Sequence, residues 1–128
     1  LTVNALVAAD SVLIPMQCEY YALEGLSDLV ETLRKIRHSL NARLEIEGLL
    51  RTMYNSQSTL TQQVSSELEN HFGDKVYQTI VPRKVRLAEA PSYGKPALLY
   101  DLRCSGSQAY LRLASEVIKR ERALRAAA

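Results

Sequence analysis

Three short apolar runs alternate with helical segments along this chain of 128 residues. The runs are SVLIP (11–15), LEIEGLLRTMY (44–54) and KVYQTIVP (75–82). Short, nearly continuous apolar runs are typical of strands buried in a parallel sheet, and parallel neighbours need crossovers of about a dozen residues or more. The pattern therefore predicts an α/β fold with a mainly parallel sheet and flanking helices.

The segments between these runs have the periodicity of amphipathic helices. The first is expected to begin near Tyr20 or Tyr21 and to end near Asn41, with an apolar stripe of Leu26, Leu29, Val30, Leu33, Ile36 and Leu40. The second follows turn and cap residues at 55–59 and ends at Gly73, with an inner face of Leu60, Val64, Leu68 and Phe72.

Two further helices are predicted at the ends of the chain. A short one spans residues 2–9, and a final one is capped by Ser105 or Ser107. The predicted apolar stripe of the final helix is Tyr110, Leu113, Ala114, Val117 and Ile118. The residues expected to face solvent are Arg112, Lys119, Arg120, Arg122 and Arg125.

The length suits one domain, so we expect residues 1–128 to form a single α/β domain or partial domain. No run approaches the roughly 20 apolar residues of a membrane span and no signal peptide is visible, so we expect a cytoplasmic protein without a membrane partner. Cys18 and Cys104 lack metal-ligand spacing and are expected to be reduced thiols. The chain opens on Leu1 and runs almost directly into a strand, so we expect an excised or truncated piece.

Charged side chains are unevenly distributed along the chain. Residues 1–81 carry six Lys or Arg and ten Asp or Glu, whereas residues 82–128 carry ten and four. A basic region attracts anionic partners through its summed field, and basic tails also serve as ordinary solvated surface. Charge alone therefore leaves an anionic partner and a solubilising surface as equal alternatives.

Basic residues and prolines concentrate in the segment VPRKVRLAEAPSYGKPALLYD (81–101). It holds three of the four prolines, four Lys or Arg and two acids. Pro82 lacks a backbone donor, so the chain has to leave the sheet there. The segment is either a solvated loop shaped by its prolines or a site for a phosphate-bearing partner, since ligands of open α/β sheets lie beyond the carboxyl ends of the strands.

Motifs for catalysis and metal binding are missing from the sequence. The patterns G-x-S-x-G, G-x-x-x-x-G-K-[ST] and G-x-G-x-x-G do not occur, and the five glycines are isolated. His38 and His71 have no Cys, His or carboxylate at metal-ligand spacing, so structural or surface roles are expected for both. No catalytic or metal-binding residue is predicted.

Four stretches of the chain match, in order, those of one known family. They are LTVNALVAADSVLIPMQCEYYALEGLSDL (1–29), EGLLRTMYNSQSTLTQQV (47–64), HFGDKVYQTIVPRKVRLAEAPSYGKPALLYD (71–101) and SGSQAYLRLASEV (105–117). The phrase P-R-x-V-R-L-x-E-A-P-S-x-G-x-P is the most specific part. The chain resembles the C-terminal half of the ParA/Soj partitioning ATPases, MinD-related P-loop proteins with a deviant Walker A loop. The resemblance implies the C-terminal half of a P-loop NTPase fold, without its Walker A region.

The resemblance implies a site for ATP and Mg²⁺ in the full-length protein. In this family the adenine is received at strand ends that match Thr52, Met53, Pro82 and Arg83 here. A purine suits flat apolar walls and a few backbone partners. The alternative is that Thr52 and Met53 simply end a strand. Without a phosphate-binding loop, the chain alone is expected neither to bind ATP tightly nor to hydrolyse it.

The same resemblance implies non-specific DNA binding by ATP-bound dimers. Arg86 matches a DNA-contacting arginine of the family, and charge and sequence proximity add Lys84, Lys95, Arg103 and Arg112 as weaker candidates. The chain departs from the family at Gln57, where an arginine often helps to bind DNA, and at Asn55, which replaces an acid. These two departures are expected to shift DNA binding toward Arg86 and its neighbours.

The resemblance favours a role in chromosome or plasmid partitioning, with a ParB-like partner that stimulates ATP hydrolysis and a location at the nucleoid. One alternative is a non-enzymatic, truncated module that keeps only the DNA- or partner-binding surface. Another is a MinD/ParA-like positioning ATPase for a different cargo. Gln17 and Glu19 lie in a further family stretch near the ATP site and the dimer face, and capping of the first long helix is an equal alternative for them.

Overall fold

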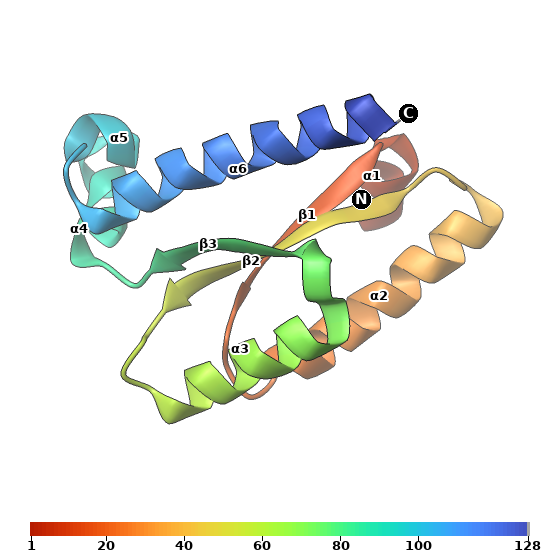
Figure 1. Ribbon diagram of the computed structural model, residues 1–128, viewed down its shortest axis with the longest axis horizontal. Coiled ribbons are helices and arrows are strands. Elements are labelled where there is room, and N and C mark those ends of the chain that lie inside the picture. Colours follow the sequence, from red (N-terminus) through yellow and green to blue (C-terminus); the bar gives the residue numbers. More distant parts are fainter. Residues whose placement is uncertain (128) are drawn as a thin grey trace.

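Three parallel strands form the middle layer of the structure, a computed structural model that describes residues 1–127 (Figure 1). They lie in the order β1–β2–β3 and span Ser11–Gln17, Glu45–Tyr54 and Val76–Pro82. Each crossover contains a helix, α2 (Ala22–Ser39) after β1 and α3 (Thr59–Phe72) after β2. The predicted parallel α/β fold is confirmed, with helix and strand ends within about two residues of the expected positions.

The remaining elements surround this unit. Helix α1 (Thr2–Ala8) precedes β1, and the short 3₁₀ turn η1 (Gly73–Lys75) joins α3 to β3. Beyond β3 the chain forms three short turns of helix, α4 (Val85–Glu89), η2 (Ala90–Tyr93) and α5 (Ala97–Tyr100). The long helix α6 (Ser105–Ala127) then runs back across the molecule. No helix among residues 1–127 is both long and apolar enough to span a membrane.

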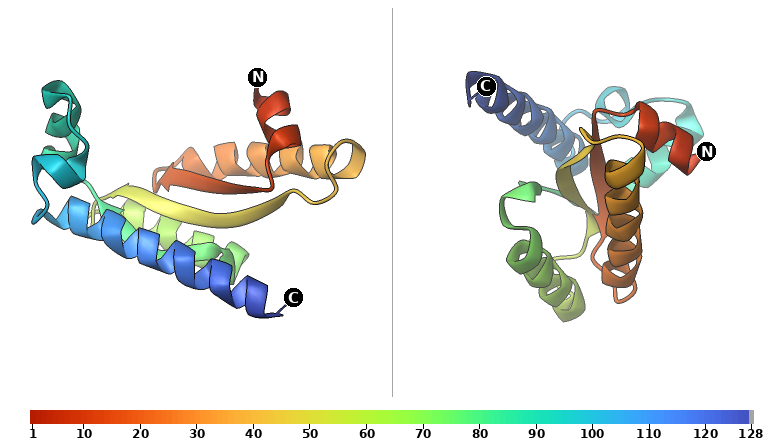
Figure 2. Two further views of the ribbon diagram at one scale, coloured as in Figure 1. Left: turned by 90° about the horizontal axis from the view of Figure 1, so that it is seen from above. Right: turned by 90° about the vertical axis from the view of Figure 1, so that its right-hand side faces the viewer.

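The sheet separates two apolar cores because successive side chains of a strand point to opposite faces. On β2, Leu49 packs with α2 and α3, whereas the adjacent Leu50 packs with α6. On β3, Val76 likewise belongs to the core under α2 and α3, and the adjacent Tyr77 belongs to the core under α6. Figure 2 shows α6 lying along β3 and leaving the β1 side of that face uncovered.

The inner face of α3 differs from the predicted one. Leu60 is 45% exposed, while Thr61 and Ser65 are buried beside Val64. The cause is a polar contact to the sheet: the buried Arg51 of β2 donates hydrogen bonds to the Ser65 hydroxyl (2.9 Å) and to the Tyr77 carbonyl oxygen (2.8 Å). Ser65, a small polar residue, therefore lies on the buried face of α3, where the apolar periodicity predicts no polar residue.

The predictions for the orientation of α6 and its cap are partly wrong. The helix starts at Ser105, and the Sγ of the preceding Cys104 accepts the Ser107 amide hydrogen (3.4 Å), so neither serine is the cap. Leu113 and Val117 do pack inward as predicted. The other three residues of the predicted stripe, Tyr110, Ala114 and Ile118, are exposed.

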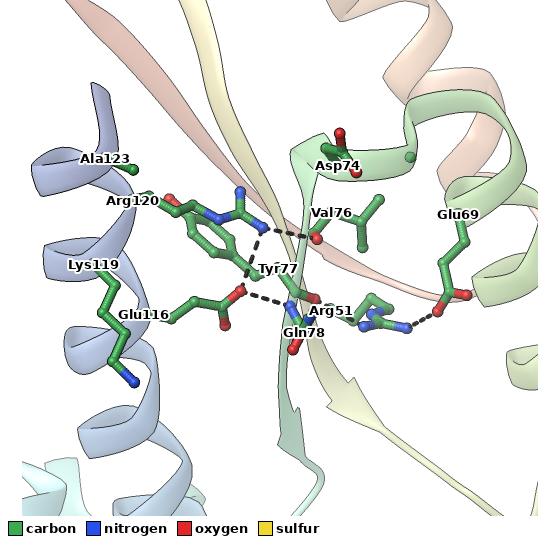
Figure 3. A pocket seen from close by; sticks show the side chains of 11 residues that line it. Arg51, Glu69, Asp74, Val76, Tyr77, Gln78, Glu116, Lys119, Arg120 and Ala123 are labelled. Atoms are coloured by element: carbon green, nitrogen blue, oxygen red, sulfur yellow. Dashed lines mark hydrogen bonds and ion pairs between the residues drawn. The ribbon is translucent and has the colours of Figure 1, made fainter. Parts of the chain in front are cut away.

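The inner face of α6 is rotated from the predicted stripe because β3 lies at an edge of the sheet formed by residues 1–127. Backbone groups on its outer side have no strand to pair with and bond to side chains of α6 instead. Both carboxylate oxygens of Glu116 face it and accept the amide hydrogens of Gln78 (2.8 Å) and Thr79 (2.9 Å) and the Thr79 hydroxyl (2.7 Å). Arg120 donates to the Val76 carbonyl oxygen (3.0 Å), so its predicted solvent-facing position is wrong (Figure 3).

An irregularity in β3 brings two consecutive amides to one carboxylate. The pairing with β2 advances from Leu49↔Val76 to Arg51↔Ile80, so β3 uses four residues where β2 uses two. Extra residues of this kind bend a strand and release its backbone groups from the ladder. The Tyr77 ring fills the space beside Gly48, where an added Cβ would lie 2.3 Å from a ring carbon, and the Arg120 guanidinium lies 4.1 Å from the ring centroid.

Replacement of Glu116 by Gln is expected to destabilise the fold in a pH-dependent way. Partial burial raises the pKa of Glu116, but hydrogen bonds from Thr79 and from the Gln78 and Thr79 amides outweigh it and hold this pKa below the usual range. Hydrogen bonds to a charged group contribute about 1.5–3 kcal/mol, so E116Q should lower the free energy of unfolding at pH 7 by about that amount.

Urea unfolding at several pH values tests this expectation. A lowered folded-state pKa stabilises fully above the ordinary glutamate pKa of about 4.3, and the stabilisation is lost as pH falls through the lower folded value. The difference between wild type and E116Q should therefore shrink in that acid range. The matched control is E121Q, whose carboxylate pairs with Arg125 at an exposed site and should matter little. Equal effects of E116Q and E121Q at pH 7 would contradict the role of Glu116.

Candidate functional site at the carboxyl ends of the strands

The carboxyl ends of all three strands meet at one edge of the sheet. The pairing register places Gln17 opposite Thr52 and Tyr54 opposite Pro82. The Arg83 amide then donates to the Tyr54 carbonyl oxygen (3.1 Å), which keeps the chain beside β2 after the strand has ended. The four residues predicted from the family resemblance, Thr52, Met53, Pro82 and Arg83, are thus brought to one edge of the sheet.

Met53 has a strained backbone at this edge. Its φ is 48°, in the left-handed region that ordinary side chains avoid at a cost of about 1–2 kcal/mol. The side chain is 45% exposed, and its Sδ accepts a hydrogen bond from the Gln17 side-chain amide (2.9 Å). Strained backbone of this kind concentrates at functional sites, where the surrounding structure holds it in place.

A second contact spans the end of β2 from one side to the other. The Arg83 guanidinium lies 4.0 Å from the Glu19 carboxylate, and both side chains are more than half exposed. An exposed pair at this distance contributes little stability, so both groups stay available to a ligand. Gln17 and Glu19, which the sequence left divided between site and helix capping, therefore lie beside the predicted adenine residues.

Two open pockets of the molecule lie elsewhere. A cavity of about 700 Å³ between α3 and α6 is lined by Arg51, Glu69, Glu116, Lys119 and Arg120, among others (Figure 3). A second, of about 380 Å³, follows β1 and the start of α2 and reaches Gln17 and Glu19. Neither of these two cavities is lined by the four predicted adenine residues, which form an open face of the chain.

The basic segment follows this edge directly. Lys84 precedes the first turn of α4, Arg86 lies in that turn, and Lys95 follows Gly94, whose φ of 64° reverses the chain. Arg103 lies between α5 and α6, and Arg112 lies about two turns into α6. All five predicted DNA-binding side chains are on exposed residues. Gly106 of α6 contacts Leu87 so closely that an added Cβ would lie 2.5 Å from its side chain, which holds α4 against α6.

Arg86 differs from its basic neighbours because it is ion-paired within the segment. Its Nε lies 3.5 Å from Asp101 Oδ2, and its Nη1 lies 3.8 Å from Glu89 Oε2. The Tyr100 hydroxyl donates to Glu89 (2.7 Å), a hydrogen bond that raises the pKa of the phenol. This cluster was not predicted from the sequence. The three-residue spacing of Arg86 and Glu89 is a helical pairing signal, but Asp101 is too distant in sequence to give one.

The departure from the family pattern at Asn55 and Gln57 has a local structural role. The Asn55 side chain accepts the Gln57 amide hydrogen (3.1 Å), and the Ser58 hydroxyl accepts the Thr61 amide hydrogen (3.3 Å). Asn55 and Gln57 therefore form the turn that precedes α3, and Gln57 is exposed.

Substitutions at Met53 test the strained backbone. At an ordinary strand position glycine is less stable than alanine by about 0.5–1 kcal/mol. Both M53G and M53A lose the thioether, but only alanine keeps a Cβ in the left-handed conformation. We expect M53G to be at least as stable as M53A, and by up to about 1 kcal/mol more stable, in urea unfolding. A glycine variant less stable than the alanine variant would show that the backbone is unstrained.

Comparisons with known proteins agree on the type of protein. The chain is 60% identical over 122 residues to the chromosome partitioning protein ParA of Caulobacter vibrioides, which covers 95% of this chain and 46% of that protein. It is 57% identical to the sporulation initiation inhibitor protein Soj of Bacillus subtilis, over 91% of this chain and 46% of that protein. The chain is 52% identical to the chromosome-partitioning ATPase Soj of Thermus thermophilus, over 94% of this chain and 48% of that protein. The chain thus spans about half the length of these curated relatives.

Family and structural comparisons extend this result. A family model described as an AAA domain matches residues 1–46. The fold is similar to that of cobyrinic acid a,c-diamide synthase from Mycobacterium smegmatis, solved with an ATP analogue and magnesium, with a TM-score of 0.71 and 24% identity over 94% of this chain and 42% of that one. This likeness shows that the two chains share an α/β fold over the aligned part. By its sequence similarity over nearly its whole length, the chain belongs to the ParA/Soj family of partitioning proteins.

Proposed function

We propose that this chain is the C-terminal part of a ParA/Soj-like ATPase that acts in chromosome or plasmid partitioning. The full-length protein would bind ATP and Mg²⁺, dimerise, and bind DNA without sequence preference. A ParB-like partner would stimulate hydrolysis, and the protein would reside at the nucleoid in the cytoplasm. The observation that carries the proposal is the meeting of the strand ends with the basic segment at one edge of the sheet.

The residues at the strand ends fit the base of a nucleotide better than its phosphates. Met53 offers a half-exposed thioether, Pro82 an apolar ring and Arg83 a planar guanidinium that can stack on a base. The sequence has no glycine-rich loop to receive phosphates or a magnesium ion. ATP bound with Mg²⁺ would supply the phosphoryl group for hydrolysis. This chain would hold the adenine, and the phosphate-binding groups would come from the rest of the protein.

Electrostatics supports the DNA part of the proposal. Lys84, Lys95, Arg103 and Arg112 are exposed on one continuous part of the chain, from the end of β3 into α6. Cations that neutralise DNA phosphates release counterions, so binding weakens steeply as salt increases. Phosphate contacts carry no sequence information, which suits a protein that binds DNA without sequence preference.

The chain by itself is expected to show no ATP turnover. Phosphoryl transfer depends on positioned cations and backbone amides around the transferring group, and the sequence has no motif that provides them. A phosphate-release assay on the purified 128-residue chain should give the buffer rate, while the full-length protein should hydrolyse ATP. Turnover by the short chain alone would overturn the division of the site between the two halves.

DNA titrations of the full-length protein with ATP test the second half of the proposal. We expect K84A and K95A to weaken binding to unrelated DNA sequences by similar factors, and each to reduce the salt slope by about 1. R86A should also weaken binding if its guanidinium reaches a phosphate. The matched control is K35A, which removes the same charge from an exposed residue of α2, a helix on the opposite side of the sheet from α6 (Figure 1).

The variants discriminate among functions. If K84A, K95A and R86A all bind DNA as the wild type does, the basic segment is ordinary solvated surface and the DNA proposal for it fails. If the full-length protein binds DNA but has no ATPase activity, the non-enzymatic binding module becomes the better account of the family resemblance.

A further inference from the structure

The ion pairs of the basic segment divide its cations into two kinds. Residues 83–103 contain five Lys or Arg and two acids, Glu89 and Asp101. Both acids lie against the same cation, Arg86. Lys84, Lys95 and Arg103 make no ion pair within the described part of the chain. The position with the strongest family resemblance to a DNA contact is therefore the one whose charge is balanced internally.

The geometry of Arg86 leaves it partly open to a ligand. Its side chain is 58% exposed, against 41% for Glu89 and 31% for Asp101. The guanidinium carbon lies 5.8 Å from the centroid of the Tyr100 ring, and Tyr100 in turn donates a hydrogen bond to Glu89. Glu89 of α4 and Asp101 at the end of α5 thus hold Arg86 from two sides, and part of its side chain faces solvent.

We propose that Asp101 and Glu89 compete with DNA phosphate for Arg86 and thereby limit the affinity of this surface for DNA. The proposal rests on the DNA-binding function proposed above and concerns how that function is tuned. A carboxylate and a phosphate oxygen use the same guanidinium N–H groups, and both are negatively charged. A phosphate that approaches Arg86 must either displace a carboxylate or stay close to one. Two internal acids therefore weaken the DNA contact without removing the cation.

The substitution D101N separates charge from local structure. Asp101 Oδ1 accepts the Arg103 amide hydrogen (3.2 Å), and Oδ2 is the atom that faces Arg86. Asparagine keeps one oxygen for the amide and removes the charge opposite the guanidinium. We expect D101N to tighten binding of the full-length, ATP-bound protein to a random-sequence duplex about two- to five-fold at about 0.1 M salt, the scale of one exposed ion pair. Fluorescence anisotropy of the labelled duplex measures this change.

A double-mutant cycle shows whether the effect passes through Arg86. In the R86A background, D101N should change affinity by less than about 1.5-fold, because the cation that the acid restrains is gone. The control E121Q removes an equal charge near the other end of α6, where the carboxylate pairs with Arg125, and should leave the affinity close to that of wild type. E89Q is a second test in the same direction, and it serves if D101N does not fold.

The outcomes separate this inference from the function on which it rests. Tighter binding by D101N or E89Q that disappears in the R86A background supports the competition. Unchanged or weaker binding by both variants overturns it, because the acids would then merely position the segment, and so does a gain that persists without Arg86. A full-length wild type that binds no DNA at low salt refutes the proposed function and the competition together.

Discussion

A carboxylate and a guanidinium from α6 close the outer edge of the sheet, and the rest of the architecture depends on this contact. Glu116 receives two amides and a hydroxyl of β3, while Arg120 binds the Val76 carbonyl and covers the Tyr77 ring. An unpaired strand edge is a template for the addition of another strand. These polar groups of β3 are bonded to α6, so within residues 1–127 β3 forms one edge of the sheet and β1 forms the other.

The same contact determines where the basic segment lies. Once α6 is held along β3, its first turns reach the carboxyl end of that strand, where Ala109 joins the second core and Gly106 receives Leu87. The segment from α4 to α5 therefore has to fold at the strand ends, beside Pro82 and Arg83. The strand-end residues and the basic segment lie together because the chain passes from β3 into α4 within three residues.

Much of this arrangement could be predicted from the sequence. The apolar runs and helical periodicities were sufficient for the parallel strands and for α2, because burial of one face imposes a pattern that is local in sequence. The strand-end residues came from the family resemblance, and their gathering at one edge follows from parallel pairing. The predictions that were wrong concern α3 and α6. Ser65, Glu116 and Arg120 face the sheet because they pair with polar groups of other elements. The periodicity of apolar residues along a helix carries no information about such partners.

The sequence by itself determined the fold class, the family, and the position of the basic segment after the third strand. These are properties of local pattern and of motif. Only the tertiary structure decided which basic side chain of the surface is ion-paired. Arg86 and Asp101 are fifteen residues apart and meet only through the fold of η2 and α5. The same holds for Met53, whose strained backbone arises where the pairing register of β2 and β3 shifts. Contacts between distant residues follow from packing, and packing is a property of the whole chain.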